Sequence, residues 1–193
     1  MWRCRPWAPI VWHSSTCHPR WFLSSARDAL LHPAFFEAAA LLRSAGVNVN
    51  TITNGWLITD KTADMIAELF GAVEVSIDGA NSDSHDRIRG RVGSFERAMR
   101  AVSSLTKRGV EVTVALTPTR STIPEFDELI ELVRPIEGVK RVVTGYVLPT
   151  GRAYRNPEMP SIREQEVFRK HVLELQERYR DDVRITCTVT LLA

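Results

Sequence analysis

The chain has 193 residues, of which 44% are hydrophobic and 25% are charged, and its formal net charge is +2. At roughly 150 residues per domain this length predicts one domain with a core of its own. Because basic and acidic residues are interleaved, the chain has no basic stripe of the kind that binds nucleic acid, and no apolar run approaches the ~20 residues needed to cross a bilayer. We therefore expect a soluble, cytoplasmic protein with no nucleic-acid and no membrane partner.

The first 28 residues differ in composition from the rest of the chain. They hold four of the five tryptophans and have no acidic residue before Asp28. Prolines interrupt the apolar stretch that a signal peptide would need, and the cysteines and histidines of this segment match no standard metal site. We expect residues 1–28 to be an atypical, poorly ordered leader and residues 29–193 to form the domain.

From residue 33 onward, helix-like and strand-like patterns alternate. Helices are predicted over residues 33–45, 60–70, 95–108, 124–133 and 161–178, with Thr59 and Ser94 as N-caps, and strands over residues 47–53, 73–77, 111–116, 139–147 and 183–189. Strands that alternate with helices of this length are joined by right-handed crossovers and are therefore parallel. The fold class is α/β, and periodicity alone leaves a barrel and an open sheet as alternatives.

Polar residues follow the strand at residues 73–77. Ser76, Asp78 and Gly79 stand where this strand ends, and Asn54 and Gly55 stand where the preceding strand ends. Parallel sheets bind ligands at the carboxyl ends of their strands, so these positions are the first candidates for a site.

Six short motifs stand in a fixed order between residues 30 and 153. They are LLHP at 30–33, TNG at 53–55, VSIDG at 75–79, HDRIRG at 85–90, GSFERA at 93–98 and PTGRA at 149–153. In this order and spacing the chain resembles radical S-adenosylmethionine (SAM) enzymes, and in particular the branch of peptide-modifying maturases and cofactor-assembly enzymes.

The resemblance implies a partial (β/α) barrel of parallel strands that binds SAM across its carboxyl ends. It also implies a 4Fe-4S cluster, held by three cysteines, that cleaves SAM reductively and starts radical chemistry on a peptide or a small cofactor precursor. Carried over to this sequence, it assigns cofactor contacts to a group of strand-end residues, which are Ser76, Arg89, Asn54, Gly55, Asp78, Leu148 and Gly151.

Each assignment has a plain structural alternative. The hydroxyl of Ser76 either meets the SAM carboxylate or satisfies a local backbone group. Asn54-Gly55 is also a common tight turn, and Asp78 more readily shapes the turn than touches a ligand. Arg89 can bind a carboxylate or phosphate as a fork, whereas His85 at a helix start can serve as a cap.

The chain departs from the family pattern in two places. It has no C-x-x-x-C-x-x-C motif, because its cysteines are Cys4, Cys17 and Cys187. The Gly-Gly-Glu-Pro-like turn after the second strand is replaced by residues 26–29, where Asp28 can stand in for the acid. We expect the first two strands of the family fold to be missing or replaced and no metal ligands in this chain, as in a fragment or a truncated or degenerate copy.

Two other functions stay open. One is a non-catalytic remnant or binding module that keeps the sheet, and the other is an aldolase-type barrel fragment, for which Asp78 is the one ionisable strand-end residue. The strand at 47–53 would also expose unpaired backbone groups unless the leader or another chain covers it, which predicts self-association through this edge.

Overall fold

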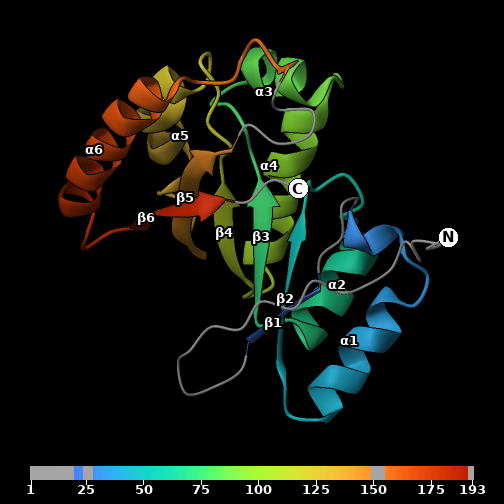
Figure 1. Cartoon of the computed structure of the whole chain (residues 1–193). Coiled ribbons are helices and arrows are strands. Elements are labelled where there is room, and N and C mark those ends of the chain that lie inside the picture. Colours follow the sequence, from blue (N-terminus) through green and yellow to red (C-terminus); the bar gives the residue numbers. More distant parts are fainter. Residues whose placement is uncertain (1–19, 24–27, 149–154, 191–193) are drawn as a thin grey trace, which may run out of the picture.

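The computed structural model describes residues 20–23, 28–148 and 155–190 and shows one parallel sheet with the strand order β1-β2-β3-β4-β5-β6 (Figure 1). The strands are β1 (Arg20–Leu23), β2 (Asn48–Thr53), β3 (Ala72–Ser76), β4 (Glu111–Ala115), β5 (Val139–Val147) and β6 (Arg184–Thr190). The helices are α1 (Phe35–Ser44), α2 (Asp60–Leu69), α3 (Ser82–Arg89), α4 (Ser94–Thr106), α5 (Phe126–Val133) and α6 (Ile162–Arg178), with short 3-10 helices η1 (Ala29–Leu31) and η2 (Ile123–Glu125). Since β1 and β6 do not pair with each other, the sheet is a partial barrel, and the predicted α/β fold is confirmed.

The two faces of the sheet have different chemistry. Val73 and Val75 of β3, and Ile77 just after it, are buried in the core cluster that also includes apolar residues of α4. The alternate residues of β3, Ala72, Glu74 and Ser76, face the opposite way. Figure 1 shows α4 and α5 behind the middle strands, and no helix of the described residues lies in front of them. The helix-covered face is apolar, whereas the other, concave face carries polar residues.

Most of the predicted elements are confirmed with boundaries that move by one or two residues. Thr59 caps α2 in a reciprocal capping box with Thr62, as its position predicted. The prediction of Ser94 as an N-cap is wrong, because Gly93 in a left-handed conformation occupies that position and the Ser94 hydroxyl bonds Asp86 instead.

The amino-terminal side of the sheet differs from its expected form. Residues Arg20–Leu23, inside the segment expected to be poorly ordered, form β1 and pair in register with β2. We expected the edge of β2 to be unpaired unless the leader or another chain covered it. Arg20–Leu23 of the leader cover this edge at Asn48–Thr51. Among the described residues β1 and β6 are the sheet edges, and no described helix is long and apolar enough to cross a membrane.

The turn after β2 packs closely against α4. Gly55 has a φ of +78°, and a Cβ placed on it would lie 2.9 Å from the Cα of Ala98 and 3.0 Å from the Cβ of Ala101. A side chain here would meet both backbone strain and a helix that has no room to move. Gly55 therefore sets the distance between the end of β2 and the helix layer.

We expect Gly55→Ala to lower the free energy of unfolding by about 2–4 kcal/mol, because left-handed strain and overpacking add. Gly46→Ala is the matched control, since Gly46 has a φ of +77° but nothing within 4 Å of its Cβ position. It should cost only about 1–2 kcal/mol, from strain alone. Urea unfolding of both variants checks this, and equal losses would contradict the close packing of the turn.

Candidate functional site

The candidate site lies at the carboxyl edge of β2, β3 and β4, and Asp78 is its centre. This carboxylate is 4% exposed. Its Oδ1 accepts a hydrogen bond from the backbone N–H of Thr117, which follows β4, at 3.0 Å. Its Oδ2 lies 2.8 Å from Nε of Arg89 at the end of α3. The Asp78 side chain therefore joins the ends of β3 and β4 to α3. These contacts agree with the expectation that Asp78 shapes the turn.

His85 holds the same junction from the other side. Its imidazole is 1% exposed, and Nδ1 accepts a hydrogen bond from the backbone N–H of Asp78 at 3.0 Å. Burial, with the positive charge of Arg89 adding to it, lowers the pKa of His85 below its usual value. His85 is therefore a neutral, buried acceptor and not a helix cap; the N-cap of α3 is Asn81.

Glu125 also belongs to this junction, although no sequence pattern pointed to it. Its Oε2 accepts hydrogen bonds from the Ala80 backbone N–H at 3.0 Å and from the Ser84 hydroxyl at 2.6 Å. Gly79 fits the same narrow space, because a Cβ there would meet Oγ of Ser84 at 2.2 Å. The loop from β3 to α3 is thus fixed to the residue that precedes α5.

Ser76 and Arg89 are the predicted site residues that keep donors for a ligand. Ser76 is half-buried at the end of β3, and its hydroxyl makes no hydrogen bond with any residue that the structure describes. The Arg89 side chain is 31% exposed, and within the described part of the chain only its Nε is engaged, by Asp78. Ser76 is the last residue of β3, with Ala115 as its partner in the register, and Arg89 at the end of α3 reaches the loop after β3 through Asp78.

The end of β2 is organised by Asp28. Its Oδ2 accepts from the Thr53 hydroxyl at 2.7 Å and from the Asn54 backbone N–H at 3.1 Å. Asn54 is exposed and its side chain accepts from Trp56 in a local turn, while Gly55 is buried against α4. Asp28 and Asn54 are thus at the carboxyl edge, whereas Gly55 acts in packing.

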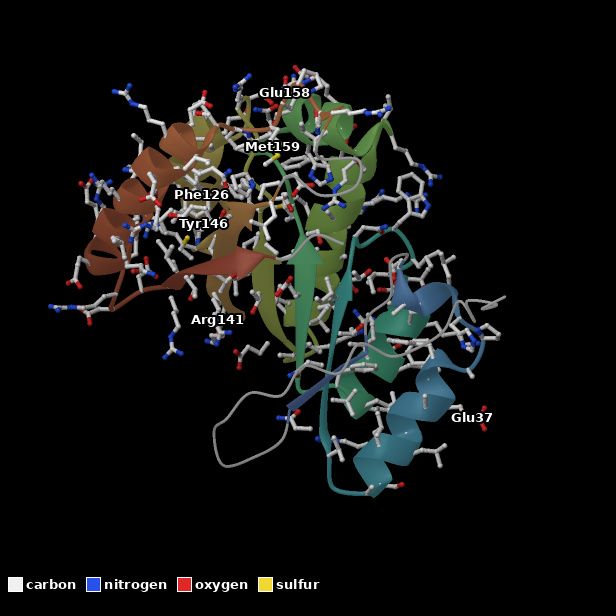
Figure 2. All side chains as sticks on the ribbon, viewed as in Figure 1. Glu37, Phe126, Arg141, Tyr146, Glu158 and Met159 are labelled. Atoms are coloured by element: carbon white, nitrogen blue, oxygen red, sulfur yellow. The ribbon has the colours of Figure 1, made fainter. Side chains whose placement is uncertain are left out.

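After β5, Leu148 is the one predicted site residue within the described part of the chain. Gln165 of α6 bonds both the N–H and the C=O of Val147, at 2.8 Å and 3.2 Å, and so fixes the end of this strand. Leu148 follows directly and is half-buried. Gly151, the other residue predicted there, lies outside the described residues. In Figure 2, Met159 and Glu158 lie at the upper end of the molecule, where α3 also lies.

The described residues do not fit an iron-sulfur cluster. Such a cluster needs three thiolates close together. Cys187 is the one cysteine in the described part of the chain, lies on β6 and has a pKa raised by burial. No group of three metal-ligating side chains occurs among the residues that the structure describes, and Cys4 and Cys17 lie outside them.

The family model described as "Radical SAM superfamily" matches residues 22–133. The chain belongs to this superfamily. It is 30% identical over 164 residues to the AdoMet-dependent heme synthase of Methanosarcina barkeri, covering 84% of this chain and 46% of that protein. It is 28% identical over 159 residues to the sporulation killing factor maturation protein SkfB of Bacillus subtilis, covering 82% of this chain and 38% of that protein.

The fold agrees with this family. The structure of native anSMEcpe with bound AdoMet and Cp18Cys peptide superposes with a TM-score of 0.71 at 18% identity, covering 87% of this chain and 50% of that one. The chain is a radical SAM domain related to peptide maturases and heme synthases, and it spans less than half the length of those two sequence relatives.

The burial of His85 predicts a pH dependence of stability. Its folded-state pKa lies below the unfolded value of about 6.5, so its contribution to stability is present above that pH and is lost as the pH falls. We expect the unfolding free energy to decrease between about pH 7.5 and about pH 5.5 more steeply in the wild type than in His85→Asn, which keeps an acceptor but does not titrate. Urea unfolding across this range measures both slopes, and parallel slopes would contradict a buried neutral His85.

Proposed function

We propose that the carboxyl edge of β2, β3 and β4 binds SAM, with Ser76 and Arg89 as the residues that hold its carboxylate. The observation that carries this proposal is the Ser76 hydroxyl at the end of β3, which bonds none of the residues that the structure describes, in a chain of the radical SAM superfamily. Two residues further on, Asp78 holds Arg89 by Nε, and the terminal nitrogens of Arg89 have no partner among the described residues. A guanidinium fork and a hydroxyl are suited donors for a carboxylate.

Asp78 positions Arg89 in this proposal. A long exposed arginine loses rotamer freedom when it binds a ligand. The 2.8 Å contact to the buried Asp78 carboxylate fixes the guanidinium beforehand and leaves its terminal N–H groups for the ligand. Asn54 and Leu148, at the neighbouring strand ends, would line the same edge, and Asp28 offers a carboxylate close to it.

As a family member, the protein would take part in the reductive cleavage of SAM, for which a 4Fe-4S cluster would supply the electron, and in radical chemistry on a peptide or a cofactor precursor. Related proteins are named as heme synthases and as a peptide maturation protein, which supports these two substrate classes. The contribution of the described residues is to bind and orient SAM and to keep water from the buried loop around Asp78.

A second function, a non-catalytic SAM-binding or partner-binding module, is favoured by one observation. The sequence contains no C-x-x-x-C-x-x-C, and the described residues place no three thiolates together. In this form the sheet and its edge would serve binding alone.

We expect Ser76→Ala and Arg89→Gln each to raise the Kd for SAM about tenfold, which corresponds to losing one charge-assisted hydrogen bond. Ser103→Ala on α4 is the control and should bind as the wild type does. Isothermal titration of the full chain with SAM gives the three values. Unchanged affinity in both site variants would contradict the assignment of the edge.

Anaerobic reconstitution with iron and sulfide separates the two functions. Because the described residues lack three neighbouring thiolates, we expect less than one cluster per chain and no broad visible absorption of a bound cluster. Stoichiometric cluster formation would show that this chain supplies its own ligands and would remove the non-catalytic alternative.

A further inference from the structure

Basic residues gather on one side of α4 and of the turn that ends it. Residues 97–108 contain Arg97, Arg100, Lys107 and Arg108 and no acidic residue. With 3.6 residues per turn, these four positions fall within an arc of about 100° around the helix. The small net charge of the chain, +2, therefore conceals a local excess of positive charge.

The four side chains line one cavity between α2 and α4, two helices that lie side by side (Figure 1). The cavity has a volume of about 340 Å³. Its other lining residues are Gly55, Ile58, Thr59, Asp60, Ser103 and Ser104. Of the residues that line it, Asp60 carries the one carboxylate, and Ile58 is the one large apolar side chain.

Arg108 ties α4 to α2 and uses the nearby carboxylates. Its Nε lies 2.6 Å from Oδ1 of Asp64, and its Nη2 lies 3.2 Å from Oδ1 of Asp60. Its Nη1 donates to the Ser104 hydroxyl at 2.8 Å. The hydrogen bond with Asp64, followed by those with Asp60 and by the charges of both carboxylates, raises the pKa of Arg108. Asp60 and Asp64 are thus engaged by Arg108, and within the described residues neither forms an ion pair with another cation of the cavity.

The other three cations keep free donors. Arg97 donates from Nη1 to the Trp56 carbonyl at 3.4 Å, and its guanidinium lies 4.4 Å from the centre of the indole ring. Arg100 donates from Nε to the Glu96 carbonyl at 3.3 Å, which leaves its two terminal nitrogens. The ammonium group of Lys107 bonds no residue in the described part of the chain. Three cations therefore share one cavity without a carboxylate bound to any of them.

An anion in this cavity would be stabilised for two reasons. Like charges on one side of a helix repel each other, and an anion between them removes that repulsion. It also gains charge-assisted hydrogen bonds, which are stronger than neutral ones. Arg100 and Lys107 are seven residues apart, which is about 10.5 Å along the helix axis. A chain of two or three linked phosphates spreads its charge along its length and suits this spacing better than a single phosphate does.

We propose that the cavity between α2 and α4 binds a di- or triphosphate group, with Arg97, Arg100 and Lys107 as its donors. The backbone of a nucleic acid suits the site less well. The side chains of Asp60 and Asp64, which are 90% and 63% exposed, stand beside the cavity and would repel a long polyanion. The site shares no residue with the edge assigned to SAM, so it does not rest on the proposed function.

Isothermal titration of the full chain with sodium tripolyphosphate tests the proposal. At an ionic strength of about 0.15 M, where the Debye length is about 8 Å, we expect tripolyphosphate to bind about tenfold more tightly than inorganic phosphate. Arg100→Gln combined with Lys107→Gln should weaken tripolyphosphate binding about tenfold, since two partly screened charge contacts are lost. The control combines Arg163→Gln with Lys170→Gln on α6, which removes the same two residue types at the same spacing from exposed positions and should leave the affinity unchanged.

Equal weakening by the two double variants would show that net charge alone decides the affinity and would overturn the site. A tripolyphosphate affinity no greater than that for phosphate would overturn it too. A short single-stranded oligonucleotide that binds more tightly than tripolyphosphate would assign the surface to nucleic acid instead.

Thermal unfolding gives a second readout that also checks folding. Without ligand, both double variants should melt close to the wild type, because all four replaced side chains are exposed. Saturating tripolyphosphate should raise the melting temperature of the wild type and of the α6 variant by a few degrees, since a ligand that binds the folded state alone stabilises it. An equal rise in the variant on α4 would contradict the proposal.

Discussion

The buried carboxylate of Asp78 is the interaction on which the candidate site depends. It binds the N–H of Thr117 after β4 and the guanidinium of Arg89, while its own N–H is held by the neutral His85. A buried charge needs partners of this kind, and breaking one partner leaves the others unpaired in a medium of low polarity. The strand ends, α3 and the arginine are therefore positioned together, and a ligand that binds Arg89 meets a side chain that is already oriented.

The second constraint is the difference between the two faces of the sheet. A parallel sheet commonly has helices on both faces and apolar residues throughout. Here the helix-covered face is mainly apolar, whereas the concave face carries Glu74 and Arg141 in one row and Asn50 in the row below. The carboxyl edge with Ser76 borders the concave face.

Local patterns predicted the elements well and the contacts between them poorly. The alternation of Val73, Val75 and Ile77 identified β3, and the predicted cap at Thr59 acts within three residues, on Thr62. Glu125 binds Ala80 across 45 residues, which no local pattern indicates. The pairing of Arg20–Leu23 with β2 was missed because a four-residue strand in an atypical leader carries little periodicity. The packing of Gly55 against α4 was missed for another reason: Asn-Gly is a common tight turn, and the sequence does not show that a helix lies against it.

The position of bound SAM shows whether Ser76 and Arg89 hold its carboxylate. A crystal structure of the full chain grown with SAM should show the ligand at the carboxyl edge of β2, β3 and β4, with its carboxylate within hydrogen-bonding distance of the Ser76 hydroxyl and the terminal nitrogens of Arg89. The Asp78 to Arg89 contact should persist in that structure. SAM bound elsewhere on the chain, or bound at this edge with its carboxylate directed away from both residues, would contradict the account.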